Sequence, residues 1–223
     1  MSNPSRCDAS GRAYAGSQRW IQHHVNQDNG VALSSRIGKM IGLAPEHIRW
    51  TSPLAGHRYM EYRDEQFLEA IGHKSAASAL RGFWPRRGPC WDALAQVATP
   101  MGAGALLIEA KSYPGEVRSG GCKASPASLN LIANSLNRTK SWFGAPPGAD
   151  WTGPLYQAAN RLAHLYFLRE VTGMPAWMVN VYFVGDPRTP TTESEWRLTL
   201  DITKRELALP DALPYVVDLM LPA

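Results

Sequence analysis

Hydrophobic and polar residues in the middle of the chain follow a pattern that predicts one helix and two strands. Over residues 59–80 apolar side chains recur at spacings that place them on one helical face, and Gly72 is the point where this helix can be interrupted. The segment GFWPRRGP (82–89) is rich in glycine and proline and predicts a loop. CWDALAQVA (90–98) and the apolar ALLIEAK (105–111) then predict two strands, separated by the turn signal TPMG.

Two helices and a strand are predicted downstream of these elements. Residues 125–142 begin with Ser125, which can cap a helix, and Pro126, which can occupy its first turn. Residues 155–172 have a strong helical pattern that stops at GMP, and 176–184 (AWMVNVYFV) have the aromatic and β-branched composition of a central strand. The order helix, strand, strand, helix, helix, strand favours an α/β fold with a central mixed β-sheet flanked by helices.

The two ends of the chain have weaker patterns. Short helices are expected over residues 18–26 and 33–42, and another over 196–209. We therefore expect an N-terminal segment whose structure the pattern leaves open, a core domain, and a C-terminal extension packed on the core, covering residues 1–58, 59–185 and 186–223.

The composition is that of a folded protein with one substantial core. Of the 223 residues, 44% are hydrophobic and 19% are charged, which excludes a disordered chain. The longest apolar stretches are far shorter than the ~20 residues of a membrane span, and the N-terminus lacks the apolar segment of a secretory signal, so we expect a cytoplasmic protein. Three widely spaced cysteines without a C-x-x-C pair argue against disulfides and structural zinc. The net charge of +4 allows an anionic partner without identifying one.

Asp92, Glu109 and Lys111 form the candidate active site. Asp92 lies near the start of one expected strand, and Glu109 and Lys111 end the next, where alternation of side chains places both on the same face. Carboxylates hold the hard divalent cations that phosphodiester hydrolysis uses, and magnesium commonly takes only one or two of them. Without metal, we expect Asp92 and Glu109 to disfavour each other's ionised form.

The arrangement of these residues resembles the motif of the PD-(D/E)xK, or restriction-endonuclease-like, nuclease superfamily. GPCWD is followed after sixteen residues by EAK, which comes directly after the apolar LLI. The resemblance implies a restriction-endonuclease-like core in which Asp92 and Glu109 bind Mg²⁺ or Mn²⁺, and Lys111 orients the attacking water or stabilises negative charge. The chain departs from the motif in that two residues separate Pro89 from Asp92.

The resemblance implies a metal-dependent nuclease that hydrolyses phosphodiester bonds, with DNA as the expected substrate, and it allows a homodimer. One alternative is a noncatalytic nucleic-acid-binding or assembly module that keeps the nuclease fold. Another is that Glu109 and Lys111 form an exposed edge pair while Asp92 caps a turn. Basic residues on both sides of the motif suit contacts with phosphates, and the candidates are Arg86, Arg87, Arg118 and Lys123.

Several other polar residues are weaker candidates for the site. Three glutamates at four-residue spacing lie on one face of the helix expected over residues 59–80, and Glu65 is our choice among Glu61, Glu65 and Glu69; a solvated face is the alternative. Glu116 can add a carboxylate from the following loop, unless it is simply solvated. One helical face, turned toward the site, solvent or an interface, is formed by Gln157, Asn160, Arg161 and His164.

Overall fold

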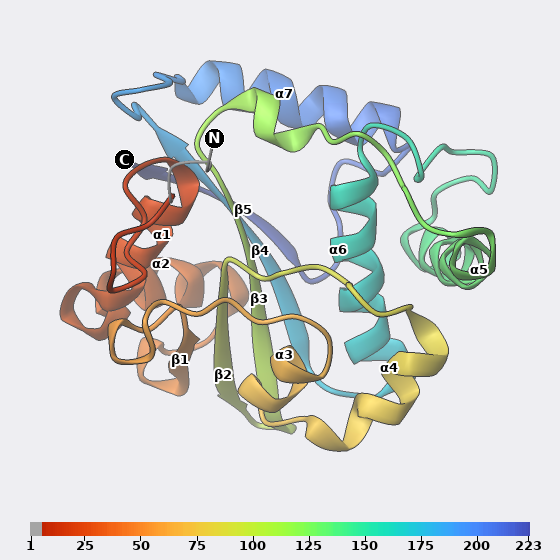
Figure 1. The fold of residues 1–223 in the computed structure, drawn as a ribbon, viewed down its shortest axis with the longest axis horizontal. Helices are drawn as coiled ribbons and strands as arrows, with labels where there is room; N and C mark the ends of the chain where they lie inside the picture. The colour runs from red at the N-terminus through yellow and green to blue at the C-terminus, as the bar shows by residue number, and fades with distance from the viewer. Residues whose placement is uncertain (1–5) are drawn as a thin grey trace.

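The computed structural model describes residues 6–223, and within them five strands form one mixed β-sheet whose spatial order follows the chain (Figure 1). The first three strands are antiparallel and the last three are parallel. Their bounds are β1 Ile48–Ser52, β2 Ala93–Thr99, β3 Gly102–Lys111, β4 Ala176–Val184 and β5 Val216–Pro222. The predicted α/β class, with a mixed sheet flanked by helices, is confirmed.

Helices cover both faces of the sheet (Figure 1). On one face lie α1 (Gly16–Asn26) and α2 (Val31–Ile41), whose apolar residues pack on all five strands. The other face carries α3 Asp64–Ala70, α4 Ala77–Phe83, α5 Pro126–Phe143, α6 Tyr156–Tyr166 and α7 Glu193–Glu206. Among the helices of residues 6–223, none combines the length and the apolar character needed to cross a bilayer.

The central strand β3 is apolar over most of its length because it is buried on both faces. Leu107 packs in the core under α3–α7, whereas Leu106 and Ile108 pack in the core under α1 and α2. All three side chains are fully buried. Alternation along β3 therefore also fixes where the polar end of the strand points: Glu109 lies on the same face as Leu107.

The helix expected over residues 59–80 is in fact two short helices. After α3 the chain turns through Gly72, which has a positive φ of 78°, and α4 begins at Ala77. Downstream, Ser125 caps α5 as expected by accepting a hydrogen bond from the Ser128 N–H. The helix expected over 155–172 is α6 followed by a π-helical turn, Phe167–Val171.

Two strands were not predicted from the sequence. β1 and β5 lie at opposite edges of the sheet, in the segments before and after residues 59–185. Each is short, and each carries a charged residue, Arg49 in β1 and Asp218 in β5, which weakens the strand signal. The sheet is thus completed by both ends of the chain.

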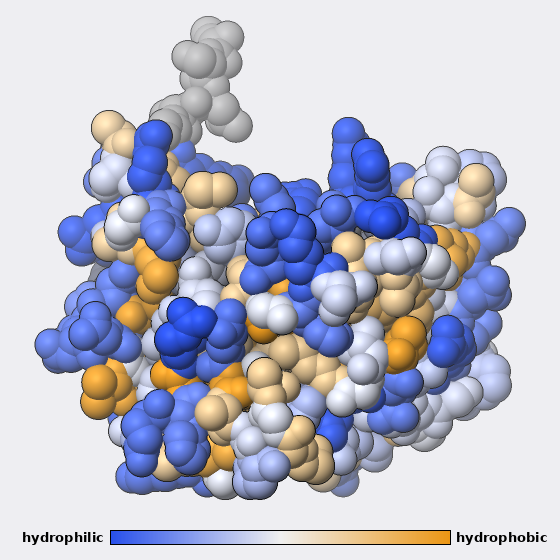
Figure 2. Space-filling model, turned by 90° about the horizontal axis from the view of Figure 1, so that it is seen from below, coloured by the Kyte–Doolittle hydropathy of each residue, from blue (hydrophilic) through white to orange (hydrophobic). Residues whose placement is uncertain are grey.

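The end of the sheet that carries the β2–β3 turn has a mixed surface. Seen from that side, hydrophilic residues dominate the outline, and apolar residues are scattered in small groups between them (Figure 2). Met101, in the β2–β3 turn, is 77% exposed. Single exposed apolar residues are ordinary on soluble proteins, so this end offers no argument for function.

Candidate active site

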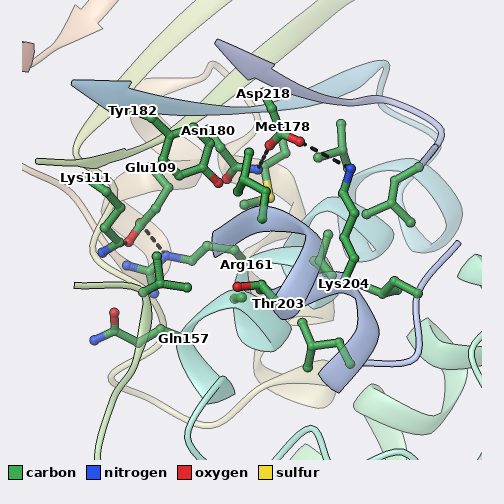
Figure 3. A pocket seen from close by; sticks show the side chains of 18 residues that line it. Glu109, Lys111, Gln157, Arg161, Met178, Asn180, Tyr182, Thr203, Lys204 and Asp218 are labelled. Atoms are coloured by element: carbon green, nitrogen blue, oxygen red, sulfur yellow. Dashed lines mark hydrogen bonds and ion pairs between the residues drawn. The ribbon is translucent and has the colours of Figure 1, made fainter. Parts of the chain in front are cut away.

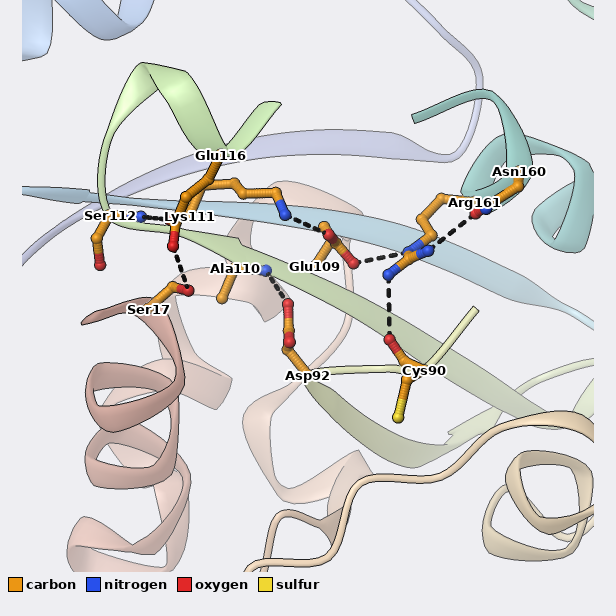
Figure 4. A network of polar contacts seen from close by, with 10 residues as sticks. All are labelled: Ser17, Cys90, Asp92, Glu109, Ala110, Lys111, Ser112, Glu116, Asn160 and Arg161. Carbon is orange, nitrogen blue, oxygen red and sulfur yellow. Dashed lines mark hydrogen bonds and ion pairs between the residues drawn. The ribbon is translucent and has the colours of Figure 1, made fainter. Parts of the chain in front are cut away.

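The antiparallel pairing of β2 and β3 brings Asp92 and Glu109 together. Ala93 pairs with Ile108, so Asp92, one residue before β2, lies beside Glu109, one residue further along β3. Both side chains belong to the face of the sheet covered by α3–α7. Asp92 is held there by the backbone N–H of Ala110, which donates to Asp92 Oδ2 at 2.7 Å (Figure 4).

Glu109 forms ion pairs with two cations inside the protein. Lys111 Nζ lies 2.7 Å from Glu109 Oε1, and Arg161 Nε lies 2.7 Å from Glu109 Oε2 (Figure 4). The side chains of Glu109, Lys111 and Arg161 are only 9%, 16% and 10% exposed. Glu109 and Lys111 are therefore not the exposed edge pair of the alternative interpretation.

The two carboxyl groups respond to this environment in opposite ways. Burial raises the pKa of Asp92 well above its usual value, and the nearby Glu109 and Glu61 raise it further. Burial also acts to raise the pKa of Glu109, but Arg161 and Lys111 outweigh it and lower the pKa of that group. The expected rise in pKa is thus found for Asp92 and is wrong for Glu109, because the expectation left out Arg161.

Arg161 is fixed by contacts on every side of its guanidinium group. In addition to Glu109, it donates to the carbonyl oxygen of Cys90 at 3.1 Å and to Asn160 Oδ1 at 2.9 Å. The guanidinium carbon lies 5.5 Å from the centre of the Trp91 ring. Arg161 thus links α6 to the loop before β2 and to the end of β3, and it is a fixed positive charge at the site.

The other residues of the predicted polar face on α6 have different roles. Asn160 supports Arg161, and Gln157 lines a cavity described below. His164 is 1% exposed and lies edge-on to the rings of Phe67, Trp84 and Trp91. Burial lowers the pKa of His164 to about 4, so it is a neutral core residue and not part of the acidic site.

Of the three candidate glutamates around α3, the structure brings Glu61 to the site and leaves the other two at the surface. Glu65 and Glu69 form exposed pairs with Arg81 and Lys74, so the choice of Glu65 is wrong. Glu61 precedes α3, and burial raises its pKa, with a further contribution from Glu109. Gln18 Nε2 donates to it at 2.9 Å.

Glu61 reaches the site because of a contact that no local pattern signals. An isolated antiparallel bridge joins Tyr62 to Trp91, the residue before Asp92. In the predicted long helix Glu61 and Glu65 would lie on the same helical face. In the structure, the chain at Glu61 is extended and lies outside α3. The Trp91 N–H donates to the Tyr62 carbonyl at 3.1 Å and fixes the two segments side by side.

Glu116 organises the loop after β3. Its carboxylate accepts hydrogen bonds from the Ser112 N–H at 2.6 Å and from the Ser17 hydroxyl at 3.4 Å (Figure 4). Ser17 belongs to α1, so Glu116 connects this loop to a helix that covers the other face of the sheet. It is engaged in holding the loop and is not brought together with Asp92.

The four basic residues expected to contact phosphates are all exposed. Arg86 and Arg87 lie in the loop that leads to Asp92, and this loop is held by two backbone N–H groups that donate to Asp64. Arg118 and Lys123 lie in the loop after β3, and Arg118 pairs with Glu206 of α7. The structure places these residues on the two loops that flank the site.

Asp92 and Glu109 are the two carboxyl groups at the site that could hold a divalent cation. Within residues 6–223, no three side chains of histidine, cysteine, aspartate or glutamate are grouped as a complete metal site. Magnesium, however, often takes one or two protein carboxylates and completes its shell with water and substrate oxygens. Burial, Glu109 and Glu61 raise the pKa of Asp92, and a cation bound beside this carboxyl group would oppose all three effects.

Comparisons with protein-family models, with curated proteins and with solved structures gave no match to this chain. The function is therefore argued from the site. Its parts are a buried carboxyl group with a raised pKa, Asp92, a second carboxylate fixed by two cations, Glu109, and a partly accessible lysine, Lys111. This combination suits reactions in which a cation and a lysine stabilise charge developing on a phosphate.

Proposed function

We propose that the protein is a metal-dependent nuclease of the restriction-endonuclease-like fold that hydrolyses phosphodiester bonds in DNA. The observation that carries the proposal is the joint placement of Asp92, Glu109 and Lys111. The two carboxyl groups come from neighbouring strands and lie on one face, and Lys111 Nζ is 2.7 Å from Glu109. Three residues separated by up to nineteen positions thus lie close together, which supports the proposal.

The order of elements gives further support. The motif residues lie on an antiparallel pair, β2 and β3, and the chain then passes through α5 and α6 before it returns as β4, parallel to β3. The resemblance implies the same succession of hairpin, helix and strand. The two helices before β1 and the pair α3–α4 offer a helix ahead of the hairpin.

Each residue has a role that follows from its surroundings. Asp92 and Glu109 would hold Mg²⁺ or Mn²⁺, which when bound neutralises phosphate charge and makes a water nucleophilic. Arg161 keeps the Glu109 carboxylate in one orientation through a charge-assisted bond. Lys111, the most exposed of the three ion-paired groups, can release one of its donors to a water molecule or to a phosphate oxygen.

The noncatalytic alternative also has an observation in its favour. Both oxygens of Glu109 already pair with buried cations, so this carboxylate is neutralised without metal. A protein that kept the fold and lost metal binding would show the same pairing. Cleavage that depends on metal separates the two proposals.

The test is incubation of the purified protein with linear, circular, single-stranded and branched DNA, with Mg²⁺ or Mn²⁺ or with a chelator. We expect cleavage with metal, none with chelator, and loss of cleavage in Asp92→Asn. Glu65→Gln is the matched control, because Glu65 forms an exposed pair away from the site, and it should cleave like the wild type. Failure of every substrate to be cut with either metal would support the noncatalytic module instead.

A further inference from the structure

A cavity opens directly beside the acidic site, on the side of β4 and β5. Glu109, Lys111 and Arg161 line one end of it, and α7 with the following loop forms its outer wall (Figure 3). Its volume is about 80 Å³. A single water needs roughly 10–15 Å³ of such space and an apolar cavity of about 150 Å³ holds a benzene molecule, so this cavity accepts several waters, and a single ring enters it fully only when the lining side chains move apart.

The long walls of the cavity are apolar. They are formed by leucine and methionine side chains from the sheet, from α6, and from α7 and the loop after it: Leu162, Met178, Leu200, Leu207, Leu209 and Leu213. Apolar side chains from the sheet and from α7 can cover the two faces of an aromatic ring. A nucleobase outside the cavity has these faces stacked on other bases or exposed to water.

The sheet supplies the polar groups of the cavity. Glu109, Asn180 and Asp218 lie in register on three neighbouring strands, so they form one row that crosses from the acidic site into the cavity. Asn180 Nδ2 donates to Asp218 Oδ1 at 2.9 Å, and Lys204 Nζ lies 3.5 Å from Asp218 Oδ2 (Figure 3). These contacts orient the Asn180 amide, whose oxygen can accept a further hydrogen bond. The amide of Gln157, which comes from α6, is a further polar group in the lining of the cavity.

We propose that this cavity binds one unpaired nucleobase, that of the nucleotide next to the phosphate that is cleaved. Lys111, at the end of the cavity beside the acidic site, is the group that can turn to the phosphate, and the apolar walls match the ring. A base can enter only if it is unstacked and unpaired, so the substrate is single-stranded DNA or an unpaired end or flap. The inference rests on the proposed nuclease function. The small volume favours a pyrimidine over a purine.

The test measures binding of mononucleotides in the presence of chelator, so that cleavage is not needed. The probes are dTMP, dCMP, dAMP and deoxyribose 5-phosphate, and the readout is calorimetry or NMR chemical-shift perturbation. We expect dTMP or dCMP to bind at least about tenfold more tightly than the sugar phosphate, because only the nucleotides place a base against the apolar walls. Resonances of residues that line the cavity should shift.

Leu213→Trp, which fills the cavity from a partly exposed loop position, should weaken dTMP binding about tenfold. Leu198→Trp is the matched control, because Leu198 is 58% exposed on α7 and does not line the cavity. Equal binding of dTMP and deoxyribose 5-phosphate to the wild type would overturn the inference even if the Leu213 variant fails to fold. Metal-dependent cleavage together with that result would leave the nuclease proposal standing and remove only the base site.

Discussion

Glu109→Gln is expected to lower the free energy of unfolding by about 3 kcal/mol at pH 7, although it removes a single negative charge. The glutamine cannot neutralise Lys111 and Arg161, whose side chains are only 16% and 10% exposed. Removing one partner of a buried ion pair leaves the other charge without compensation, which costs more than the pair itself contributes. Urea denaturation of the wild type and the variant measures the difference.

Two matched variants show whether this loss is specific to Glu109. Glu65→Gln breaks an exposed pair with Arg81 and should change stability by less than about 1 kcal/mol. Asp92→Asn should leave stability equal or higher at pH 7, because the raised pKa of Asp92 means that its ionised form is disfavoured in the folded protein. A Glu109→Gln variant as stable as the wild type would contradict the account of the site as a fixed ion-pair cluster.

The pH dependence of the two variants should have opposite signs. The folded pKa of Glu109 is lowered, so its contribution is present above its usual value of 4.5 and is lost as the pH falls through the lowered pKa. The deficit of Glu109→Gln should therefore shrink in acid. The folded pKa of Asp92 is raised, so the wild type loses stability as the pH rises from 3.8 through that pKa. The advantage of Asp92→Asn should grow over the same range.

Lys111→Ala is expected to reduce metal-dependent cleavage by about 10²–10³-fold, the usual cost of removing one group that stabilises developing charge. The fold should persist, because Arg161 remains bound to Glu109 Oε2. Metal binding should also persist, because the variant removes the Lys111 ammonium group, which competes with a metal ion for the Glu109 carboxylate. Single-turnover cleavage and the shift of melting temperature with Mn²⁺ measure the two effects separately.

A matched control for this variant is Lys74→Ala, which removes a lysine from an exposed pair with Glu69. It should cleave at the rate of the wild type. If Lys111→Ala also kept the wild-type rate, Lys111 would have no part in the chemistry. If it lost cleavage and metal response together, the lysine would act by holding the metal site in shape.

The parts of the site that the sequence predicted are those fixed by local structure. The alternation of side chains along one strand puts Glu109 and Lys111 on the same face. The strand itself can be recognised from the sequence because β3 is buried on both faces and is therefore almost continuously apolar. Asp92 joined them through the pairing of consecutive strands. The sequence pattern predicts Arg161 only as one member of a polar helix face. Its hydrogen bond to Glu109 joins residues fifty-two positions apart, and no local pattern predicts such a contact.

The errors have similar physical causes. A helix that begins at residue 59 puts Glu61 and Glu65 on one face, whereas α3 begins only at Asp64 and the bridge between Tyr62 and Trp91 keeps the chain extended at Glu61. The strands β1 and β5 lie at the edges of the sheet, where a short strand with a charged residue resembles a loop. In each case a contact between distant segments decided the outcome.

The most direct test of the account is the melting temperature of the wild type across a series of Mn²⁺ concentrations, compared with Asp92→Asn and with chelator. A metal that binds only the folded protein stabilises it in proportion to the logarithm of its concentration over the dissociation constant. We predict a melting temperature that rises steadily with Mn²⁺ for the wild type and changes much less for Asp92→Asn, with scans slow enough to be reversible. A wild type indifferent to Mn²⁺, or a variant with the same response, would contradict a shared metal site at Asp92 and Glu109.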